Sequence, residues 1–195
     1  MVKVLAVNNY PTEERFLRLS RCLEDNGARV TSIPWREASA KLFDSFDGVA
    51  LSGSPDMLSE PRIQAKYAEE VDAIRETKSA VLGVCFGHQM MAHAFGSEVV
   101  EDGQHVLKFV NTSLLSDSGL FEGLPRRSML LESRHEVVKS VPSGFELLAS
   151  SETSPIAAIK HRTLPLYSVQ SHPERYCKAY PEGKTLVGNF VRLLR

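Results

Sequence analysis

The chain has 195 residues, of which 43% are hydrophobic and 24% charged, and its formal net charge is −1. This length fits one domain, residues 1–195, with a substantial buried core. The near-neutral charge gives no reason to expect nucleic acid or an anionic membrane as a partner. Three widely separated cysteines argue against a disulfide framework and for a reducing compartment. Without a leader-like start or an apolar run of membrane-spanning length, we expect a cytoplasmic protein.

The first half of the chain alternates apolar strands with helical segments. Strands are expected over residues 2–7, 29–33, 48–52 and 80–84. Helices are expected after the N-cap candidate Thr12 and ending just before Gly27, from Pro61 to Lys78 and from His88 to about Phe95. Apolar residues recur at helical spacing in these segments. The alternation predicts a parallel sheet that is covered by helices on both faces.

The second half has a different pattern. Shorter β-like pieces separated by turns are expected from about residue 99 to 138, and further strands over 145–149, 156–160 and 165–170. A last helix is expected from about Lys184. The whole pattern predicts a single-domain, flavodoxin-like three-layer α/β/α sandwich. Its central sheet is expected to be mostly parallel, with a smaller β-rich excursion around 99–150.

One segment has the layout of a nucleophile elbow. An apolar run leads into Gly83-Val84-Cys85-Phe86-Gly87, and a helix-compatible segment follows. The G-x-C-x-G spacing is typical of a sharp strand-to-helix turn, where flanking side chains would clash. The free N–H groups and dipole of the following helix favour the reactive thiolate. A buried structural cysteine beside a tight turn is the alternative.

A second segment carries the base that such a cysteine needs. A short apolar strand ends in His172-Pro173-Glu174, which places a carboxylate two residues after a histidine. A nucleophilic cysteine requires a base, and the base requires a third group that orients its ring. A surface turn would explain this tripeptide alone, but the cysteine elbow in the same chain favours a catalytic pair.

The positions of these residues relative to the strands agree with a shared site. Ser54, Cys85 and His172 each follow the end of an expected strand. In open α/β sheets, ligands bind beyond the carboxyl ends of the strands. The three residues are therefore expected at one edge of the sheet.

The motifs together resemble a class I, triad-type glutamine amidotransferase domain. The resemblance rests on G-V-C-F-G-H-Q at 83–89, Q-S-H-P-E at 170–174 and L-S-G-S-P at 51–55, and it covers essentially the whole chain. Residues 152–161 and 119–125 are most similar to the separate glutaminase subunit of archaeal-type GMP synthetase.

The resemblance implies hydrolysis of the glutamine side-chain amide by a catalytic triad. Cys85 would attack the amide carbon, His172 would move the proton to the leaving ammonia, and Glu174 would orient the imidazole. No cofactor and no metal are implied.

The resemblance also implies the residues around the triad. Backbone N–H groups of Gly53, Ser54 and Phe86 would form the oxyanion hole. Gln89, Ser133 and Glu136 are expected to bind the substrate.

Two positions depart from the family pattern. The oxyanion loop is commonly S-G-G-P, whereas this chain has Ser54 at the second glycine. Serine tolerates a positive φ poorly, so the loop is expected to need a partner or substrate to become active. The segment usually written Ser-His-x-Asp reads Ser133-Arg134-His135-Glu136 here, so the histidine is replaced or displaced by one. Glu132 and Asp117 are expected on the solvated surface.

Three functions remain open. The first is an amidotransferase subunit that supplies ammonia to a separate synthetase, the ATP-pyrophosphatase subunit that makes GMP. The second is a free-standing γ-glutamyl peptidase or hydrolase of the same fold, because such relatives also carry serine at the position of Ser54. The third is an inactive binding module, which would require a degenerate triad.

Overall fold

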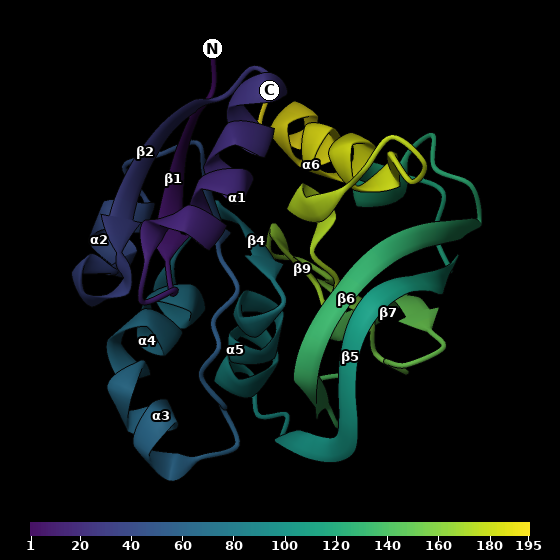
Figure 1. The fold of residues 1–195 in the computed structure, drawn as a ribbon. Helices are drawn as coiled ribbons and strands as arrows, with labels where there is room; N and C mark the ends of the chain where they lie inside the picture. The colour runs from purple at the N-terminus through teal and green to yellow at the C-terminus, as the bar shows by residue number, and fades with distance from the viewer.

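A computed structural model describes all 195 residues, and its core is one nine-stranded sheet (Figure 1). The strand order across the sheet is β2-β1-β3-β4-β9-β8-β7-β5-β6. The strands are β1 (Lys3–Asn8), β2 (Arg29–Pro34), β3 (Gly48–Leu51), β4 (Ala80–Val84), β5 (Val99–Leu114), β6 (Arg127–Val138), β7 (Phe145–Ser151), β8 (Ala158–His161) and β9 (Leu166–Val169).

The sheet has a parallel half and an antiparallel half. Strands β2-β1-β3-β4-β9 pair in parallel, in the order of a flavodoxin-like sheet. Every pairing from β9 through β8, β7 and β5 to β6 is antiparallel. The predicted α/β class is confirmed. The strands around 99–150 belong to the central sheet and pair antiparallel, so four of the eight strand pairings are parallel and four are antiparallel.

Helices cover both faces of the parallel half, as the alternating pattern predicts. Figure 1 shows α1 and α6 together on one side and α2 to α5 on the other. The helices are α1 (Glu13–Asp25), α2 (Ala40–Phe43), α3 (Pro61–Lys66), α4 (Ala68–Glu76), α5 (Phe86–Ala94) and α6 (Glu182–Leu193). Successive β1 residues alternate between the two layers: Val4 packs with α1 and α6, and Leu5 packs with the core of α4 and α5. The sheet therefore lies between two apolar cores.

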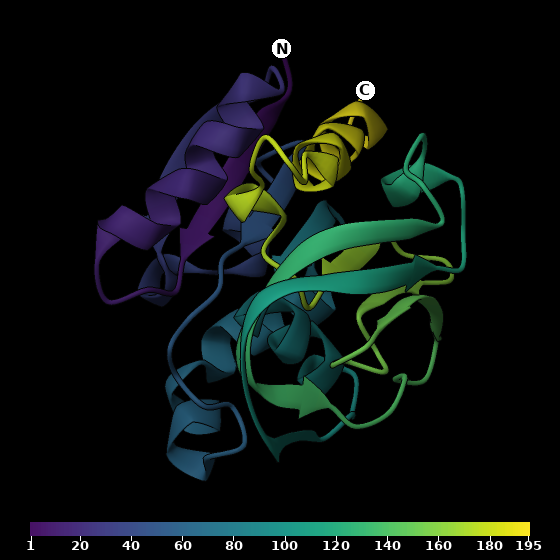
Figure 2. The same cartoon turned by 45° about the vertical axis from the view of Figure 1, so that its right-hand side comes forward.

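The structure differs from the sequence pattern at two places. The helix expected from Pro61 to Lys78 is divided at Tyr67, whose φ of −103° and ψ of 14° interrupt it between α3 and α4. The short β pieces expected over 99–138 are instead two long strands, paired through most of their length (Figure 2). Their register shifts between Glu101 and Val106, and this irregularity hides the alternation in the sequence.

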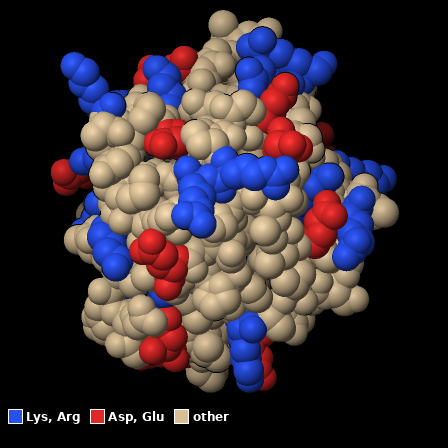
Figure 3. Space-filling view, turned by 90° about the vertical axis from the view of Figure 1, so that its right-hand side faces the viewer, with Lys and Arg blue, Asp and Glu red and all other residues tan.

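The surface carries both signs of charge. On the face drawn in Figure 3, basic and acidic side chains lie interspersed, consistent with the net charge of −1. None of the helices combines the length and the apolar character that crossing a bilayer requires.

Candidate active site

Cys85 lies in the strained turn that the glycine spacing predicts. It is the only non-glycine residue with a positive φ, 52°, and it directly precedes α5. Such a conformation costs of order 1–3 kcal/mol and persists only where the surroundings enforce it. The turn presents the sulfur at the N-terminus of α5, where the helix dipole favours a negative charge.

The flanking glycines are required by space. A Cβ on Gly83 would lie 2.5 Å from the carbonyl oxygen of Gly87, and a Cβ on Gly87 would lie 2.8 Å from the Leu51 side chain. Helix α5 therefore approaches β4 at Gly83 and β3 at Gly87 too closely for any side chain. The predicted steric reason for the G-x-C-x-G spacing is confirmed.

His172 and Glu174 form a buried pair next to Cys85. The Nδ1 atom of His172 lies 2.7 Å from Oε1 of Glu174, and both side chains are 3% exposed. Burial acts to lower the pKa of His172, but the charges of Glu174 and Cys85 outweigh it and raise the pKa to about 10. The imidazole is thus held as a cation between a carboxylate and the sulfur at neutral pH.

The three predicted oxyanion donors lie at this site with free N–H groups. Gly53 and Ser54 donate no backbone hydrogen bond within the chain, and Phe86 is the first residue of α5, where N–H groups have no helical acceptor. Ser54 does not have a positive φ, so the reason for expecting this loop to need a partner or substrate before it becomes active is wrong. Its hydroxyl instead accepts the N–H of Asp56 at 3.1 Å and stabilises the loop.

The predicted substrate residues line a cavity of about 120 Å³ that also contains Cys85 and His172. Gln89, Ser133 and Glu136 all contribute to its surface. The carbonyl of Ser133 lies 3.5 Å from the Cys85 sulfur. Their contact with a substrate stays a prediction.

Two of these side chains also hold the site together. The carboxylate of Glu136 accepts the N–H groups of Leu58 at 2.7 Å and Ser59 at 2.8 Å, beyond the oxyanion loop. The amide of Gln89 donates to the carbonyl of Glu136 at 3.0 Å. The elbow helix, strand β6 and the segment after β3 are therefore fixed relative to one another.

Sequence reasoning missed two residues near the cysteine, Gln170 and Tyr10. The amide of Gln170 lies 3.6 Å from the Cys85 sulfur. The hydroxyl of Tyr10 would lie 2.5 Å from a Cβ on Gly53, and a carbon of the His172 ring would lie 2.8 Å from it. Gln170 stands within the motif that contains His172 and was therefore detectable, whereas nothing in the sequence places Tyr10 at the site.

The hydroxyl of Tyr10 is protonated and uncharged in this position. Burial raises the pKa of its hydroxyl, and the neighbouring charges of Cys85 and Glu174 raise it further. Gly53 must lack a side chain because Tyr10 and His172 fill the space beside it.

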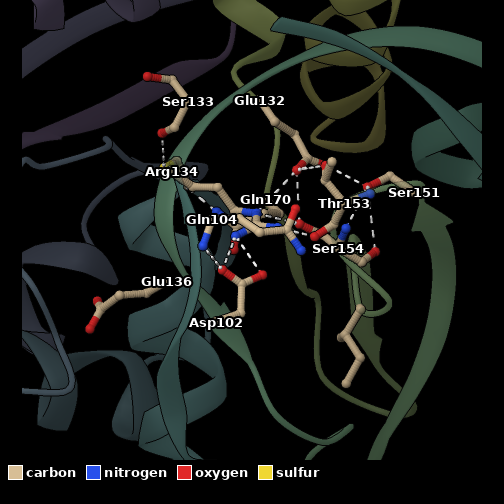
Figure 4. A network of polar contacts seen from close by, with 12 residues as sticks. Asp102, Gln104, Glu132, Ser133, Arg134, Glu136, Ser151, Thr153, Ser154 and Gln170 are labelled. Atoms are coloured by element: carbon tan, nitrogen blue, oxygen red, sulfur yellow. Dashed lines mark hydrogen bonds and ion pairs between the residues drawn. The ribbon is translucent and has the colours of Figure 1, made fainter. Parts of the chain in front are cut away.

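Behind the cavity lies a buried polar network centred on Glu132 and Arg134 (Figure 4). The carboxylate of Glu132 accepts the hydroxyls of Ser151, Thr153 and Ser154 at 2.6 to 2.8 Å. It also lies 3.3 Å from Nε of Arg134. The expectation that Glu132 is solvated is wrong, because these four donors compensate its burial.

Arg134 connects this network to β5. Its fully buried guanidinium donates to Asp102 at 3.1 Å and to the backbone carbonyl of Thr153. The next residue, His135, is exposed and stacks edge-on against His105 with ring centroids 4.2 Å apart. Arg134 and His135 both line the cavity that contains Cys85, so replacement and displacement of the family histidine both stay open.

A second buried acid lies behind the oxyanion loop. Glu70 in α4 is fully buried, and its Oε1 accepts the side-chain amide of Asn9 at 3.2 Å. Asn9 in turn donates its backbone N–H to the hydroxyl of Ser52 at 2.9 Å. Burial raises the pKa of Glu70 to about 8, so the group is largely protonated at neutral pH.

The site therefore has the parts of a cysteine-dependent acyl-transfer centre: a strained nucleophile, a histidine that carries the proton to be transferred with its orienting carboxylate, and free backbone donors. The family profile of Glutamine amidotransferase class-I matches residues 14–193. The chain belongs to this family. Its relatives agree with the assignment across the length of the chain.

Two archaeal relatives of this amidotransferase bear the name of the glutamine-hydrolysing GMP synthase subunit. The protein of Thermococcus kodakarensis is 39% identical over 147 residues, which are 75% of this chain and 74% of the relative. The protein of Archaeoglobus fulgidus is 31% identical over 194 residues and covers 100% of both chains. A crystal structure from Thermoplasma acidophilum, provisionally named as a GMP synthase subunit, superposes with a TM-score of 0.87 at 26% identity, over 100% of this chain and 94% of the other.

The remaining histidines of this amidotransferase have other surroundings. His88 is buried between the Ser168 hydroxyl at 2.8 Å and the Ile156 carbonyl at 3.1 Å, and burial lowers its pKa to about 4. It is therefore a neutral core residue that connects α5 to β9. No group of three or more His, Cys, Asp or Glu side chains is arranged to hold a metal ion.

Proposed function

We propose that the chain hydrolyses the side-chain amide of glutamine and supplies the ammonia to a separate synthetase subunit. The observation that carries this proposal is the buried pair of His172 and Glu174, at 2.7 Å, beside the strained Cys85. This is the arrangement in which a base activates a thiol and is itself oriented by a third group.

The proposed reaction begins with attack of the Cys85 sulfur on the amide carbon. The oxyanion that forms would accept N–H groups of the Gly53–Ser54 loop and of Phe86, and one such donor is typically worth about 3 kcal/mol. His172 delivers its proton to the leaving nitrogen, and the C–N bond breaks to release ammonia. Water then hydrolyses the thioester with His172 as general base, which gives glutamate.

The proposed acceptor is the ATP-pyrophosphatase subunit of GMP synthetase. Support comes from the relatives named as a glutamine-hydrolysing GMP synthase subunit, which match this chain over nearly its whole length. The name of those relatives implies a second subunit that uses the ammonia.

The test is a glutaminase assay of the purified chain, alone and with a candidate ATP-pyrophosphatase subunit and its nucleotide. We expect the chain alone to hydrolyse glutamine, because its oxyanion donors are free and Ser54 is not strained. GMP formation that depends on glutamine and on both subunits is the positive result.

Two outcomes would count against the proposal. Full activity of the chain alone, with γ-glutamyl peptides preferred over glutamine, would favour a free-standing γ-glutamyl peptidase. Absence of glutamine hydrolysis with and without the partner would favour a binding module.

A further inference from the structure

The peptide bond between Gly53 and Ser54 carries one of the proposed oxyanion donors, and a neighbouring side chain fixes its orientation. The carbonyl of Gly53 accepts the hydroxyl of Ser52 at 3.0 Å. Ser54 lines the cavity that contains Cys85, whereas Ser52 does not. The carbonyl of this peptide is therefore bound by a side chain that lies outside the cavity lining.

Fixing the carbonyl also directs the N–H of the same peptide. The chain has no cis peptide bond, and in a trans peptide the C=O and N–H groups point in opposite directions. The N–H of Ser54 consequently points away from the side on which Ser52 holds the carbonyl. It donates no backbone hydrogen bond within the chain, so it is free to donate to an oxyanion that forms in the cavity.

The hydroxyl of Ser52 makes this contact in only one sense. Its oxygen accepts the backbone N–H of Asn9 at 2.9 Å, and an N–H group can only donate. The carbonyl of Gly53 can only accept, so the single hydroxyl proton of Ser52 is directed to it. Ser52 is buried, and both partners of its hydroxyl are backbone groups. The orientation of the hydroxyl is thus determined by the backbone around it.

A buried amide and a buried acid hold Ser52 in place. The side chain of Asn9 donates to the backbone carbonyl of Ser52 at 3.3 Å and to Oε1 of Glu70 at 3.2 Å. Both Asn9 and Glu70 are buried. These contacts connect the residues that follow β1 and β3 to helix α4, and the proposed reaction uses none of them.

The peptide needs this restraint because of the glycine that precedes it. Gly53 cannot carry a side chain, since Tyr10 and His172 occupy the space beside it. Glycine allows backbone rotation that other residues resist, so the peptide can turn over at little steric cost. A turned peptide would present a carbonyl oxygen to the oxyanion, and like partial charges repel. The reaction would then lose a donor that is typically worth about 10²- to 10³-fold in kcat.

We infer that Ser52 is a positioning residue of the oxyanion hole, whose hydroxyl holds the Gly53–Ser54 peptide with its N–H turned toward the site. The inference rests on the proposed function, because the oxyanion belongs to that reaction. Ser52 acts through the peptide and does not line the cavity. It gives the loop its active orientation without a positive φ at Ser54.

The test compares two reactions of Cys85, only one of which forms an oxyanion. Glutamine hydrolysis passes through a tetrahedral intermediate. Iodoacetamide instead alkylates the sulfur at a methylene carbon, where the S–C bond forms as the C–I bond breaks and iodide leaves. Ser52→Ala should lower kcat for glutamine by about thirtyfold, less than outright loss of a donor, because the N–H remains in the chain. KM and the rate of Cys85 alkylation, followed by peptide mass spectrometry, should stay within about twofold of wild type.

Three further variants locate the effect. Ser128→Ala is the matched control, because Ser128 is a buried serine that donates to the backbone carbonyl of Pro125 at 2.8 Å and does not line the cavity. It should leave kcat and alkylation unchanged, and thermal melts compare its stability with that of Ser52→Ala. Ser52→Thr keeps the hydroxyl and should recover most of the lost kcat. His172→Ala should slow both reactions, because it removes the cation that favours the thiolate.

The inference is wrong if Ser52→Ala hydrolyses glutamine as fast as Ser128→Ala does. It is also wrong if kcat, KM and alkylation deteriorate together, since Ser52 would then only support the fold, or if Ser52→Thr is as slow as Ser52→Ala. In each of these cases the wild-type chain still hydrolyses glutamine, and the proposed function stands. A wild-type chain that is alkylated at Cys85 but does not hydrolyse glutamine would remove the proposed function, and the inference with it.

Discussion

The two halves of the sheet contribute to the site by different physical means. In the parallel half, backbone geometry positions the nucleophile: Cys85 has a strained φ of 52°, and Gly83 and Gly87 let α5 pack closely against β4 and β3. In the antiparallel half, the Ser133 wall of the cavity is supported by buried charges, Glu132 and Arg134, and by the hydroxyls around them.

This difference predicts different consequences of mutation. A site that is positioned by its backbone tolerates few changes in residue size, and its catalysis depends on only a few side chains. A wall held by buried charges depends on complete pairing, because one missing partner leaves a charge uncompensated. Substitutions in the parallel half should therefore reduce turnover, and substitutions in the antiparallel network should reduce stability.

The largest effect is expected for His172→Ala in the parallel half. Removal of the base should lower kcat for glutamine by about 10⁴-fold, nearly as much as loss of the nucleophile. Glu174→Gln is the graded comparison, because it keeps the shape but weakens the charge on the imidazole. Glu174→Gln should lower kcat for glutamine by about a hundredfold. Steady-state kinetics with a thermal melt of each variant checks both, and a mild effect of His172→Ala beside a severe effect of His135→Ala would refute the triad.

Glu132→Gln should have the largest effect on stability. The carboxylate accepts three hydroxyls and pairs with Arg134, so its neutralisation should lower the free energy of unfolding by about 3 kcal/mol. Urea unfolding measures the change. The control is Asp117→Asn. Asp117 is 79% exposed and its partner Arg126 is 71% exposed, so this change should lower the free energy of unfolding by less than about 0.5 kcal/mol. Similar small losses in both variants would show that the network does not support the antiparallel half.

The last effect is spread over pH and concerns Glu70, behind the oxyanion loop. Its pKa is raised by burial from 4.5 to about 8, so the unfolded chain loses this proton at lower pH than the folded chain. Stability from this group is present below pH 4.5 and is lost as the pH rises toward 8, by about 1.4 kcal/mol per pH unit. Glu70→Gln should remove that slope between about pH 5.5 and pH 7.5. Urea unfolding across this range checks it, and parallel pH profiles of the two proteins would contradict a neutral, buried Glu70.

Much of the parallel half follows from the sequence because its signals are local. Apolar strands, helical spacing and the glycines around Cys85 lie within short segments, and the family motifs add His172 and Glu174. The antiparallel half is harder to predict from the sequence, because the pairing of its long strands β5 and β6 shifts register between Glu101 and Val106. A bulge removes the simple alternation on which strand prediction depends.

Contacts between distant segments are the part that no local pattern contains. Glutamate is usually a surface residue. Glu132 is buried here because the hydroxyls of Ser151, Thr153 and Ser154, at and after the end of β7, donate to its carboxylate. Tyr10 and His172 come from distant segments in the same way, and both lie beside Gly53. Such residues become predictable only once the strand order is known.

The most direct test of the central claim is covalent labelling by a glutamine-like electrophile, followed by peptide mass spectrometry. The chain offers an internal comparison, because Cys22 is buried and Cys177 is exposed, and neither stands at an elbow. We predict a single adduct, on Cys85, that glutamine suppresses and that His172→Ala slows. Glutamine-protected labelling of Cys22 or Cys177, or glutamine turnover that persists in Cys85→Ala, would contradict the assignment of Cys85 as the nucleophile.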